Sequence, residues 1–288
     1  MVNGIIIESQ FALHHIHNTE QLGFDCRAYS KYKYGDATRA AEFGRALCDG
    51  FVKKYSDLLL TCNRQFMGIS SPKGLVPPAA YYMFQSFLNE LNLYLTANGR
   101  PAAVEHNIKR VSTMSADYSQ LETDQRFAHL TKEGYSIDKK PLEGKFLLII
   151  DDIRITGSHE KIIVQLLKSL SIENPRIFLY FAQLLNPEVA ATFEHELNTC
   201  AVSCLDDIYS MLQDSHCNFA INTRLVKGIL RADEKQLDAF LERIDIKLLI
   251  QLYEACLAAN YHNIDAFSSN FQKIKTCFNE KQKKNPID

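Results

Sequence analysis

Four short apolar runs, separated by segments with helical periodicity, constrain the fold of this chain more than any other feature. The runs are 65–71, 102–108, 145–150 and 176–185, and between them lie the apolar segment 79–95 and the pattern Ile163, Leu166, Leu167 and Leu170. The run KFLLII is apolar after its first residue, as expected for a strand buried on both faces of a parallel sheet. Strands that alternate with helices in this way indicate βαβ units. We therefore expect an α/β fold with an open, mostly parallel sheet and helices on both faces.

The pattern changes on both sides of this central region. The segment 1–60 is mixed in character, and within it residues 35–55 have the periodicity of a helix that Asp36 caps. After about residue 205 the strand patterns stop, and helix-like patterns follow over 235–244, 247–259 and 266–278. We therefore predict three parts: an N-terminal segment (1–60), an α/β core (61–200) and a C-terminal helical appendage (201–288).

Composition and charge narrow the classes of partner. The 288 residues carry a formal net charge of -2, which provides no global attraction to nucleic acid or to an anionic membrane. Neither a signal peptide nor an apolar stretch long enough to span a bilayer is present in the sequence. None of the eight cysteines forms a CxxC pair. We expect a protein of the reduced cytoplasm without nucleic-acid or membrane partners, whose cysteines are unpaired and serve as buried small hydrophobic residues.

The stretch that follows the run 145–150 carries the most chemistry. Asp151 and Asp152 come directly after the predicted strand, at the kind of strand end where open α/β sheets bind ligands. The turn IRITGSH then enters a helix, where backbone N–H groups and the helix dipole attract anions. Gly157 permits close approach of a ligand, and Thr156 and Ser158 add hydroxyl groups. One half of this turn suits sugar hydroxyls or magnesium and the other half suits phosphate, which are the groups of a ribose 5-phosphate.

The segment LLIIDDIRITGSHE (147–160) resembles the ribose-phosphate-binding signature of type I phosphoribosyltransferases. The resemblance implies that Asp151 and Asp152 contact the ribose hydroxyls of phosphoribosyl pyrophosphate (PRPP) and hold Mg²⁺, directly or through water and the hydroxyls. It implies a 5-phosphate cradle formed by Ile155, Thr156, Gly157, Ser158 and His159. Arg154 stands where the family more often has an aliphatic residue, and His159 where it usually has Thr or Ser.

Other interpretations of the paired acids are weaker. The two aspartates can simply form a turn that caps a helix. A prenyltransferase DDxxD motif requires an acid at position 155, which is Ile155, and a dinucleotide-binding GxGxxG motif is missing from the sequence. The HHIH run (14–17) has neither a carboxylate nor a cysteine at ligand spacing, so these histidines are interpreted as core or surface residues rather than as zinc ligands.

A second anion site is expected at the end of the run 65–71. The segment GISSPKGLVPPAA (68–80) resembles the family's pyrophosphate loop, and the implied donors are Ser70, Ser71, Lys73 and Gly74. That loop often carries a cis peptide in the family, and Pro72 is the residue that we expect to supply it here. The long polar segment 109–144 corresponds to the family's mobile catalytic loop. Together with Asp151 and Asp152, Lys109 and Arg110 at its root are the candidate catalytic residues. Tyr118 and Arg126 are further candidates within the segment.

The function that the resemblance implies is transfer of the ribose 5-phosphate of PRPP to a nitrogenous base, with Mg²⁺ and release of pyrophosphate. The alternatives are a regulator that binds PRPP without turnover and, more remotely, a scaffold whose helical appendage binds a partner. Base recognition in the family comes from a hood built from the chain ends; the candidates are Arg27, Lys31, Tyr32, Lys33, Tyr34, Asn222, Arg224 and Lys227. A homodimer stays open as the oligomeric state.

Overall fold

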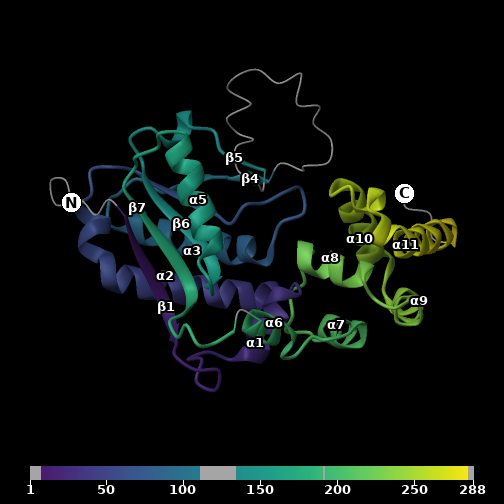
Figure 1. Ribbon diagram of the computed structural model, residues 1–288. Coiled ribbons are helices and arrows are strands. Elements are labelled where there is room, and N and C mark those ends of the chain that lie inside the picture. The colour runs from purple at the N-terminus through teal and green to yellow at the C-terminus, as the bar shows by residue number, and fades with distance from the viewer. Residues whose placement is uncertain (1–7, 111–133, 191, 285–288) are drawn as a thin grey trace. The chain divides into compact units, whose positions relative to one another are not determined.

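The computed structural model describes residues 8–110, 134–190 and 192–284 (Figure 1). The strands are β1 (Glu8–Ile16), β2 (Phe66–Ser70), β3 (Val104–His106), β4 (Lys109–Arg110), β5 (Tyr135–Ser136), β6 (Phe146–Arg154) and β7 (Arg176–Leu184). The helices are α1 (Cys26–Lys33), α2 (Ala37–Thr61), α3 (Ala79–Ala97), α5 (Ser158–Ser169), α6 (Phe193–Thr199), α7 (Leu205–Leu212), α8 (Thr223–Leu230), α9 (Glu234–Arg243), α10 (Ile246–Ala258) and α11 (Asp265–Lys284), with short 3-10 turns η2 (Lys140–Leu142) and η3 (Tyr261–Asn263).

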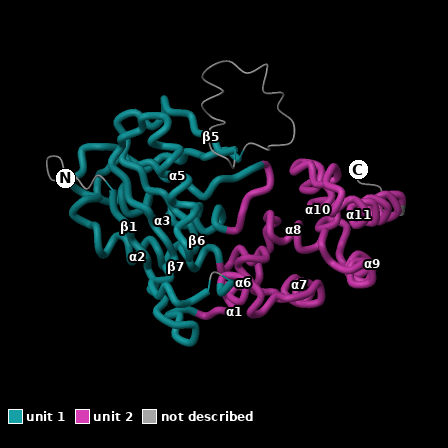
Figure 2. The backbone as a smooth tube through the Cα atoms, in the orientation of Figure 1, with its two compact units in different colours: residues 1–24, 40–74, 80–193 teal, residues 25–39, 75–79, 194–288 magenta. Residues whose placement is uncertain are grey.

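The chain divides into two compact units, which Figure 2 shows in different colours. Unit 1 comprises residues 1–24, 40–74 and 80–193, and unit 2 comprises residues 25–39, 75–79 and 194–288. This division differs from the three consecutive segments expected from the sequence. The N-terminal segment is shared between the two units, because its first strand belongs to the sheet of unit 1 and the residues around α1 belong with the C-terminal helices.

Unit 1 is built on five parallel strands in the order β1-β7-β6-β2-β3. The two central strands, β6 and β7, are buried along nearly their whole length, which explains their unbroken apolar sequences. A separate antiparallel pair joins β4 to β5. The predicted α/β fold with a mostly parallel sheet is therefore confirmed, and each predicted core strand is found to within a few residues.

Helices cover both faces of this sheet (Figure 1). On one face Ile163, Leu166 and Leu167 of α5 belong to the same buried cluster as Ile149 and Phe178 of the sheet. The other face is covered by α2 and α3. There a Cβ atom on Gly68 would lie 2.9 Å from the ring of Phe84, so the glycine lets α3 approach the sheet closely.

Strand β1 was not predicted, because its sequence ESQFALHHI lacks a strong strand pattern. Among the described strands it lies at the edge of the sheet and pairs with β7 alone, and several of its residues keep contact with water. Edge positions tolerate polar residues, which weakens the apolar signal in the sequence. His14 of the HHIH run packs against Phe24 and Phe181. Burial, followed by the charge of His15, lowers the pKa of His14.

The helix predicted over residues 35–55 is α2, which runs further, to Thr61. Its predicted cap is present, because Oδ1 of Asp36 accepts a hydrogen bond from the backbone N–H of Arg39 at 3.1 Å. Tyr55 has non-helical angles (φ -121°, ψ 23°), so α2 consists of two helical parts joined at a kink.

Unit 2 has a helical core of its own. Its centre is formed by fully buried side chains of α8, α10 and α11, among them Leu225, Ile229, Leu249, Leu252 and Ile274. The three helices predicted over 235–244, 247–259 and 266–278 are α9, α10 and α11. Amphipathic periodicity identified them because each buries one face against the others. The shorter helices α6, α7 and α8 were not predicted individually.

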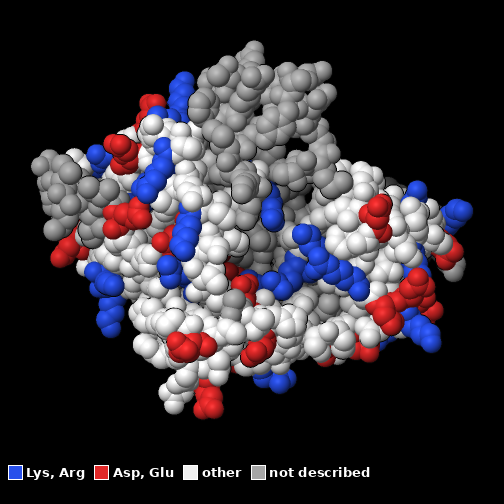
Figure 3. Space-filling model, viewed as in Figure 1, with Lys and Arg blue, Asp and Glu red and all other residues white. Residues whose placement is uncertain are grey.

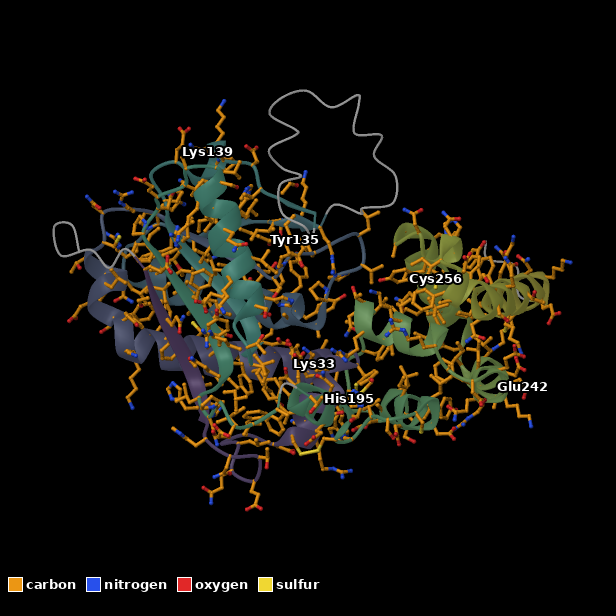
Figure 4. All side chains as sticks on the ribbon, viewed as in Figure 1. Lys33, Tyr135, Lys139, His195, Glu242 and Cys256 are labelled. Carbon is orange, nitrogen blue, oxygen red and sulfur yellow. A yellow bond between two sulfur atoms is a disulfide. The ribbon has the colours of Figure 1, made fainter. Side chains whose placement is uncertain are left out.

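Two of the cysteines differ from the expectation. Cys26, at the start of α1, and Cys200, just after α6, form a disulfide within unit 2, visible as a yellow bond in Figure 4. The prediction of unpaired cysteines is therefore wrong for this pair, because residues distant in sequence are brought together by the fold. Cys48 and Cys256 are buried free thiols as predicted, and burial raises the pKa of each to about 12.

Charged side chains are mixed over the visible face of unit 1, where Lys and Arg lie among Asp and Glu (Figure 3). This mixture agrees with the small formal net charge of -2. Among the helices of the described residues, none combines the length and the apolar character needed to cross a membrane.

Candidate functional site

The two aspartates of the predicted ribose site lie inside β6. The strand continues to Arg154, so the expectation that it ends before Asp151 is wrong. Asp151 is aligned with Tyr180 of β7 in the parallel register. Because successive residues of a strand point to opposite faces, the two carboxylates leave the strand on different sides. Asp152 is buried, whereas the side chain of Asp151 keeps 16% of its surface exposed.

Asp151 connects three segments of unit 1. Its Oδ1 accepts a hydrogen bond from the hydroxyl of Ser71 at 2.5 Å and one from the backbone N–H of Asp152 at 2.9 Å. Its Oδ2 lies 3.5 Å from Nδ1 of His159 in the first turn of α5. The structure thus brings together residues of the predicted pyrophosphate loop, ribose site and phosphate cradle around one carboxylate. Asp152 is oriented by the backbone N–H of Ile153, which donates to its Oδ1 at 2.8 Å.

The predicted phosphate cradle is a tight turn at the N-terminus of α5. Gly157 is the N-cap residue and has left-handed angles (φ 71°, ψ 13°), which glycine adopts at low cost. The hydroxyls of Thr156 and Ser158 lie 2.8 Å apart, and the backbone N–H of Ser158 donates to the Thr156 hydroxyl at 3.3 Å. A turn of this kind followed by a twelve-residue helix presents N–H groups and the positive end of a dipole to an anion.

Arg154, the first departure from the family pattern, is held by an internal network. Its Nε donates to Oε2 of Glu160 at 2.8 Å, and the Tyr180 hydroxyl donates to the same oxygen at 2.7 Å. The amide of Gln10 donates to the other oxygen, Oε1, at 2.6 Å. A Cβ atom on Gly157 would lie 2.8 Å from a terminal nitrogen of Arg154. Arg154 therefore packs over the turn and fixes it to α5.

This network raises the pKa of the Tyr180 hydroxyl. Burial raises the pKa of Tyr180, and the hydrogen bond to Glu160 and the negative charges of Glu160 and Asp151 raise it further. The sequence did not single out Glu160 or Tyr180. A charged residue in the first turn of a helix is common, and a tyrosine in an apolar strand looks like an ordinary core residue.

The predicted pyrophosphate loop follows β2. Ser70 is still part of the strand, is fully buried, and donates its hydroxyl to the carbonyl of Ser71, so this side chain does not face solvent as its predicted role requires. No peptide bond in the described residues is cis, so the expected cis bond before Pro72 is wrong. A Cβ on Gly74 would meet no atom within 4 Å, which leaves the backbone there open to a ligand.

Lys73 pairs with the root of the predicted catalytic loop. Its backbone N–H donates to the carbonyl of Ile108 at 3.1 Å, and its carbonyl accepts from the N–H of Arg110 at 3.1 Å. Lys109 and Arg110 are both exposed, and the guanidinium of Arg110 lies 5.9 Å from the ring centre of Tyr135, labelled in Figure 4. The two candidate catalytic residues Lys109 and Arg110 therefore lie beside Lys73 in the folded chain. Tyr118 and Arg126 lie outside the described residues.

The carboxylate oxygens of the site decide whether Mg²⁺ can bind there. No group of three or more His, Cys, Asp or Glu side chains within the described ranges is arranged to hold a metal ion. Mg²⁺ is usually bound through one or two carboxylates together with waters and substrate phosphates. The partly exposed Asp151 is a suitable oxygen donor of this kind. A dedicated protein cage is not required for the predicted chemistry.

A cavity of about 290 Å³ borders the cradle. It is lined by Ile155 and Thr156 and by the residues at and after the end of β7: Leu184, Leu185, Asn186, Pro187 and Val189. Asn186 shapes its wall, because its amide donates to the carbonyl of His17 at 3.0 Å and its oxygen accepts from the N–H of Glu188 at 3.0 Å. Nothing in the sequence indicated this cavity, because its apolar wall residues look like the end of a strand.

The two groups of hood candidates are brought together in unit 2. Asp36 forms a bridge with Phe219, and the amide of Asn222 donates to the carbonyl of Lys33 at 3.2 Å. Tyr32 and Asn222 are almost fully buried, so we interpret them as structural residues rather than as contacts to a base. Lys31 and Tyr34 keep partial exposure.

The parallel sheet, the paired acids and the turn at Gly157 define an α/β protein with a candidate sugar-phosphate site. A family model described as "PRTase ComF-like" matches residues 7–274. The chain belongs to this family of phosphoribosyltransferase-like proteins, and the resemblance found in the sequence is confirmed. A comparison with curated proteins found no significant match.

Solved structures of phosphoribosyltransferases are similar to parts of the chain. Adenine phosphoribosyltransferase from Saccharomyces cerevisiae is 12% identical, with 49% of this chain and 68% of that chain covered and a TM-score of 0.30. A hypoxanthine phosphoribosyltransferase from Staphylococcus aureus is 16% identical, with 51% and 76% covered and a TM-score of 0.32. The enzyme of the same name from Trypanosoma cruzi is 15% identical, with 55% and 72% covered and a TM-score of 0.32.

Proposed function

We propose that the protein is a phosphoribosyltransferase that binds PRPP and Mg²⁺ and exchanges pyrophosphate for a nitrogenous base at C1 of the ribose. The observation that carries the proposal is the hydrogen bond between Ser71, which directly follows β2, and Asp151, which lies within the neighbouring strand β6. This bond supports the proposal because one partner belongs to the segment predicted to bind pyrophosphate and the other to the segment predicted to bind ribose. The left-handed turn at Gly157 adds a phosphate cradle next to both.

Each part of the site has a defined task in this proposal. Asp151, which is partly exposed, receives the ribose hydroxyls, and the negative charges of Asp151 and the buried Asp152 favour the positive charge that develops on the sugar as pyrophosphate leaves. The N–H groups after Gly157 hold the 5-phosphate, and Lys73 with Gly74 receives the leaving pyrophosphate. Mg²⁺, held by Asp151 and the substrate oxygens, supplies charge neutralisation when bound. The protein contributes mainly position and electrostatics.

The cavity beside the cradle is the proposed place for the acceptor base. Its volume of about 290 Å³ exceeds the roughly 150 Å³ in which an engineered protein cavity binds benzene, so a planar ring fits. Its lining side chains are mainly apolar and so suit the faces of an aromatic ring. Lys109 and Arg110 are proposed to act on the departing pyrophosphate from the root of the segment that follows them.

A regulator that binds PRPP without turnover is the second candidate. One observation favours it: the ammonium group of Lys73 lies 3.4 Å from a carboxylate oxygen of Glu105, so its charge is partly neutralised before any ligand arrives. The two functions share the binding site and differ in turnover. Binding of PRPP therefore supports both, and release of pyrophosphate supports only the enzyme.

The test has two parts. Release of pyrophosphate from PRPP is measured with Mg²⁺ across a panel of purine, pyrimidine and pyridine bases, and PRPP binding is measured by calorimetry. We expect release with at least one base. Binding without release for any base contradicts the enzyme and supports the regulator.

The variant Asp151→Asn with Asp152→Asn is expected to lose PRPP binding while remaining folded. The matched control is Asp49→Asn with Asp57→Asn, which makes the same charge change at two exposed positions of α2. Normal PRPP affinity in the first double variant would refute the ribose assignment and with it both functions.

A further inference from the structure

Lys73 lies in a cluster of four side chains in unit 1. Its Nζ is 3.4 Å from Oε1 of Glu105 on β3 and 3.5 Å from the ring centre of Tyr81 on α3. The side chains of Lys73 and Glu105 keep only 21% and 28% of their surface exposed. The ammonium group therefore contacts both an anion and an aromatic face, and each of these stabilises a cation.

Glu105 is itself held in place from α3. The amide of Gln85 donates to its Oε2 at 2.7 Å, and the Tyr81 hydroxyl donates to its Oε1 at 3.3 Å. Glu105 is aligned with Gly68 of β2 in the parallel register. Gly68 faces α3, so Glu105 points toward the same helix. The carboxylate is thus oriented by hydrogen bonds from two side chains of α3.

The backbone of Lys73 is fixed as well. Its N–H and carbonyl are both used in hydrogen bonds to Ile108 and Arg110. Only the side chain can move toward a ligand in the loop. Any anion that recruits the ammonium group must compete with Glu105 for it, and the carboxylate repels the same anion.

We propose that Glu105 is a positioning residue that restrains Lys73 and so weakens the binding of pyrophosphate, which favours release of this product. The inference rests on the proposed function, in which Lys73 receives pyrophosphate. It adds a residue that the sequence did not indicate, and it assigns that residue a direction of effect. Removing the Glu105 charge frees Lys73 and tightens pyrophosphate binding.

The test measures the dissociation constant of pyrophosphate by calorimetry for the full-length protein and for Glu105→Gln. We expect binding about threefold to fivefold tighter in the variant at low ionic strength, the scale of one partly exposed ion pair. The gain is expected to shrink as salt is added, because screening weakens charge interactions. A purely structural role of Glu105 does not produce this salt dependence.

Two further variants complete the design. Glu143→Gln removes one negative charge from an exposed position of the same unit and is expected to leave the affinity unchanged. Lys73→Gln is expected to weaken binding, and adding Glu105→Gln to it is expected to produce little further change, since the restrained cation is gone. An equal gain from Glu105→Gln with and without Lys73 overturns the proposal.

The outcomes separate the inference from the function on which it rests. The inference alone is overturned if the parent binds pyrophosphate, Lys73→Gln weakens this binding, and Glu105→Gln leaves it unchanged or weaker. Weaker binding that appears only with magnesium would identify Glu105 as a cation ligand and also overturns it. Both the inference and the pyrophosphate assignment are overturned if the parent does not bind pyrophosphate, or if Lys73→Gln does not change the binding.

Discussion

The hydroxyl of Ser71 donates a 2.5 Å hydrogen bond to Oδ1 of Asp151. The two residues follow the last aligned pair of β2 and β6, so this bond fixes the start of the predicted pyrophosphate loop to the predicted ribose site within β6. A hydrogen bond to a charged group contributes about 1.5–3 kcal/mol. The relationship therefore has consequences for binding that a single substitution can test.

Replacing Ser71 with alanine removes a donor that orients Asp151. We therefore expect PRPP affinity to fall about tenfold, which corresponds to about 1.4 kcal/mol of binding free energy. Calorimetric titration with PRPP provides the measurement. The control is Ser169→Ala, whose hydroxyl donates to the Leu166 carbonyl within α5 and has no part in the site. Equal affinity in Ser71→Ala and the parent would show that the bond does not position Asp151 for ligand.

Alanine at Gly157 is expected to destabilise the protein more than alanine at Gly144. Both glycines have φ of 71°, which costs other residues about 1–2 kcal/mol. A methyl group at position 144 meets nothing within 4 Å, whereas at position 157 it meets Arg154. Displacing Arg154 from Glu160 adds about 1 kcal/mol or more. Urea unfolding of both variants measures the difference, and equal losses would contradict the packing of Arg154 over the turn.

The raised pKa of Tyr180 predicts a loss of stability in alkali. Burial, with the hydrogen bond and charge of Glu160, keeps the native phenol protonated above the unfolded-state pKa of about 10. The native state then binds more protons than the unfolded state, so the free energy of unfolding falls by about 1.4 kcal/mol per pH unit above that value. Below it the contribution of Tyr180 is fully present.

The measurement compares the free energy of unfolding of the parent and Tyr180→Phe between about pH 9 and pH 11, roughly one unit on each side of the pKa of a tyrosine in the unfolded chain. The stability advantage of the parent is expected to shrink as pH rises, because only the parent has the protected proton. Tyr94→Phe serves as the control, since Tyr94 belongs to α3, on the opposite face of the sheet from α5. A constant difference between parent and Tyr180→Phe across the interval would be inconsistent with the protected phenol.

The disulfide between Cys26 and Cys200 predicts the result of a thiol count. The denatured protein is expected to show six reactive thiols before reduction, corresponding to the free cysteines, and two more after it. Reductant is expected to lower the free energy of unfolding by about 2–5 kcal/mol in the parent. The variant Cys26→Ser with Cys200→Ser is expected not to respond to reductant. Eight thiols before reduction would show that the bond does not form.

Local patterns predicted the parts of the fold that depend on local physics. The run 145–150 and the segment 79–95 are apolar because both elements are buried, and Asp36 caps a helix through a contact three residues away. The motif 147–160 predicted the strand, turn and helix that the structure shows. The family is confirmed by a match over residues 7–274.

The features that the sequence did not predict depend on contacts between distant residues. Gln10 and Glu160 are 150 positions apart, and Lys73 and Glu105 are 32 apart. No local pattern distinguishes these residues from an ordinary solvated side chain. The position of Ser70 was misjudged for a related reason: the strand β2 includes it, and all residues of this strand are buried by neighbours that are distant in the sequence.

The place of β1 in the sheet has a consequence for how the chain is made. Its neighbour among the described strands is β7, with Glu8 aligned with Arg176 and Ile16 with Leu184. Among the described strands, the pairing partner of β1 is therefore complete only when nearly all of unit 1 has left the ribosome. Contacts of such long sequence separation form slowly, because a large loop must close first. During synthesis the segment 8–16 therefore waits for β7, and an unpaired strand of this kind is prone to aggregation unless a chaperone covers it.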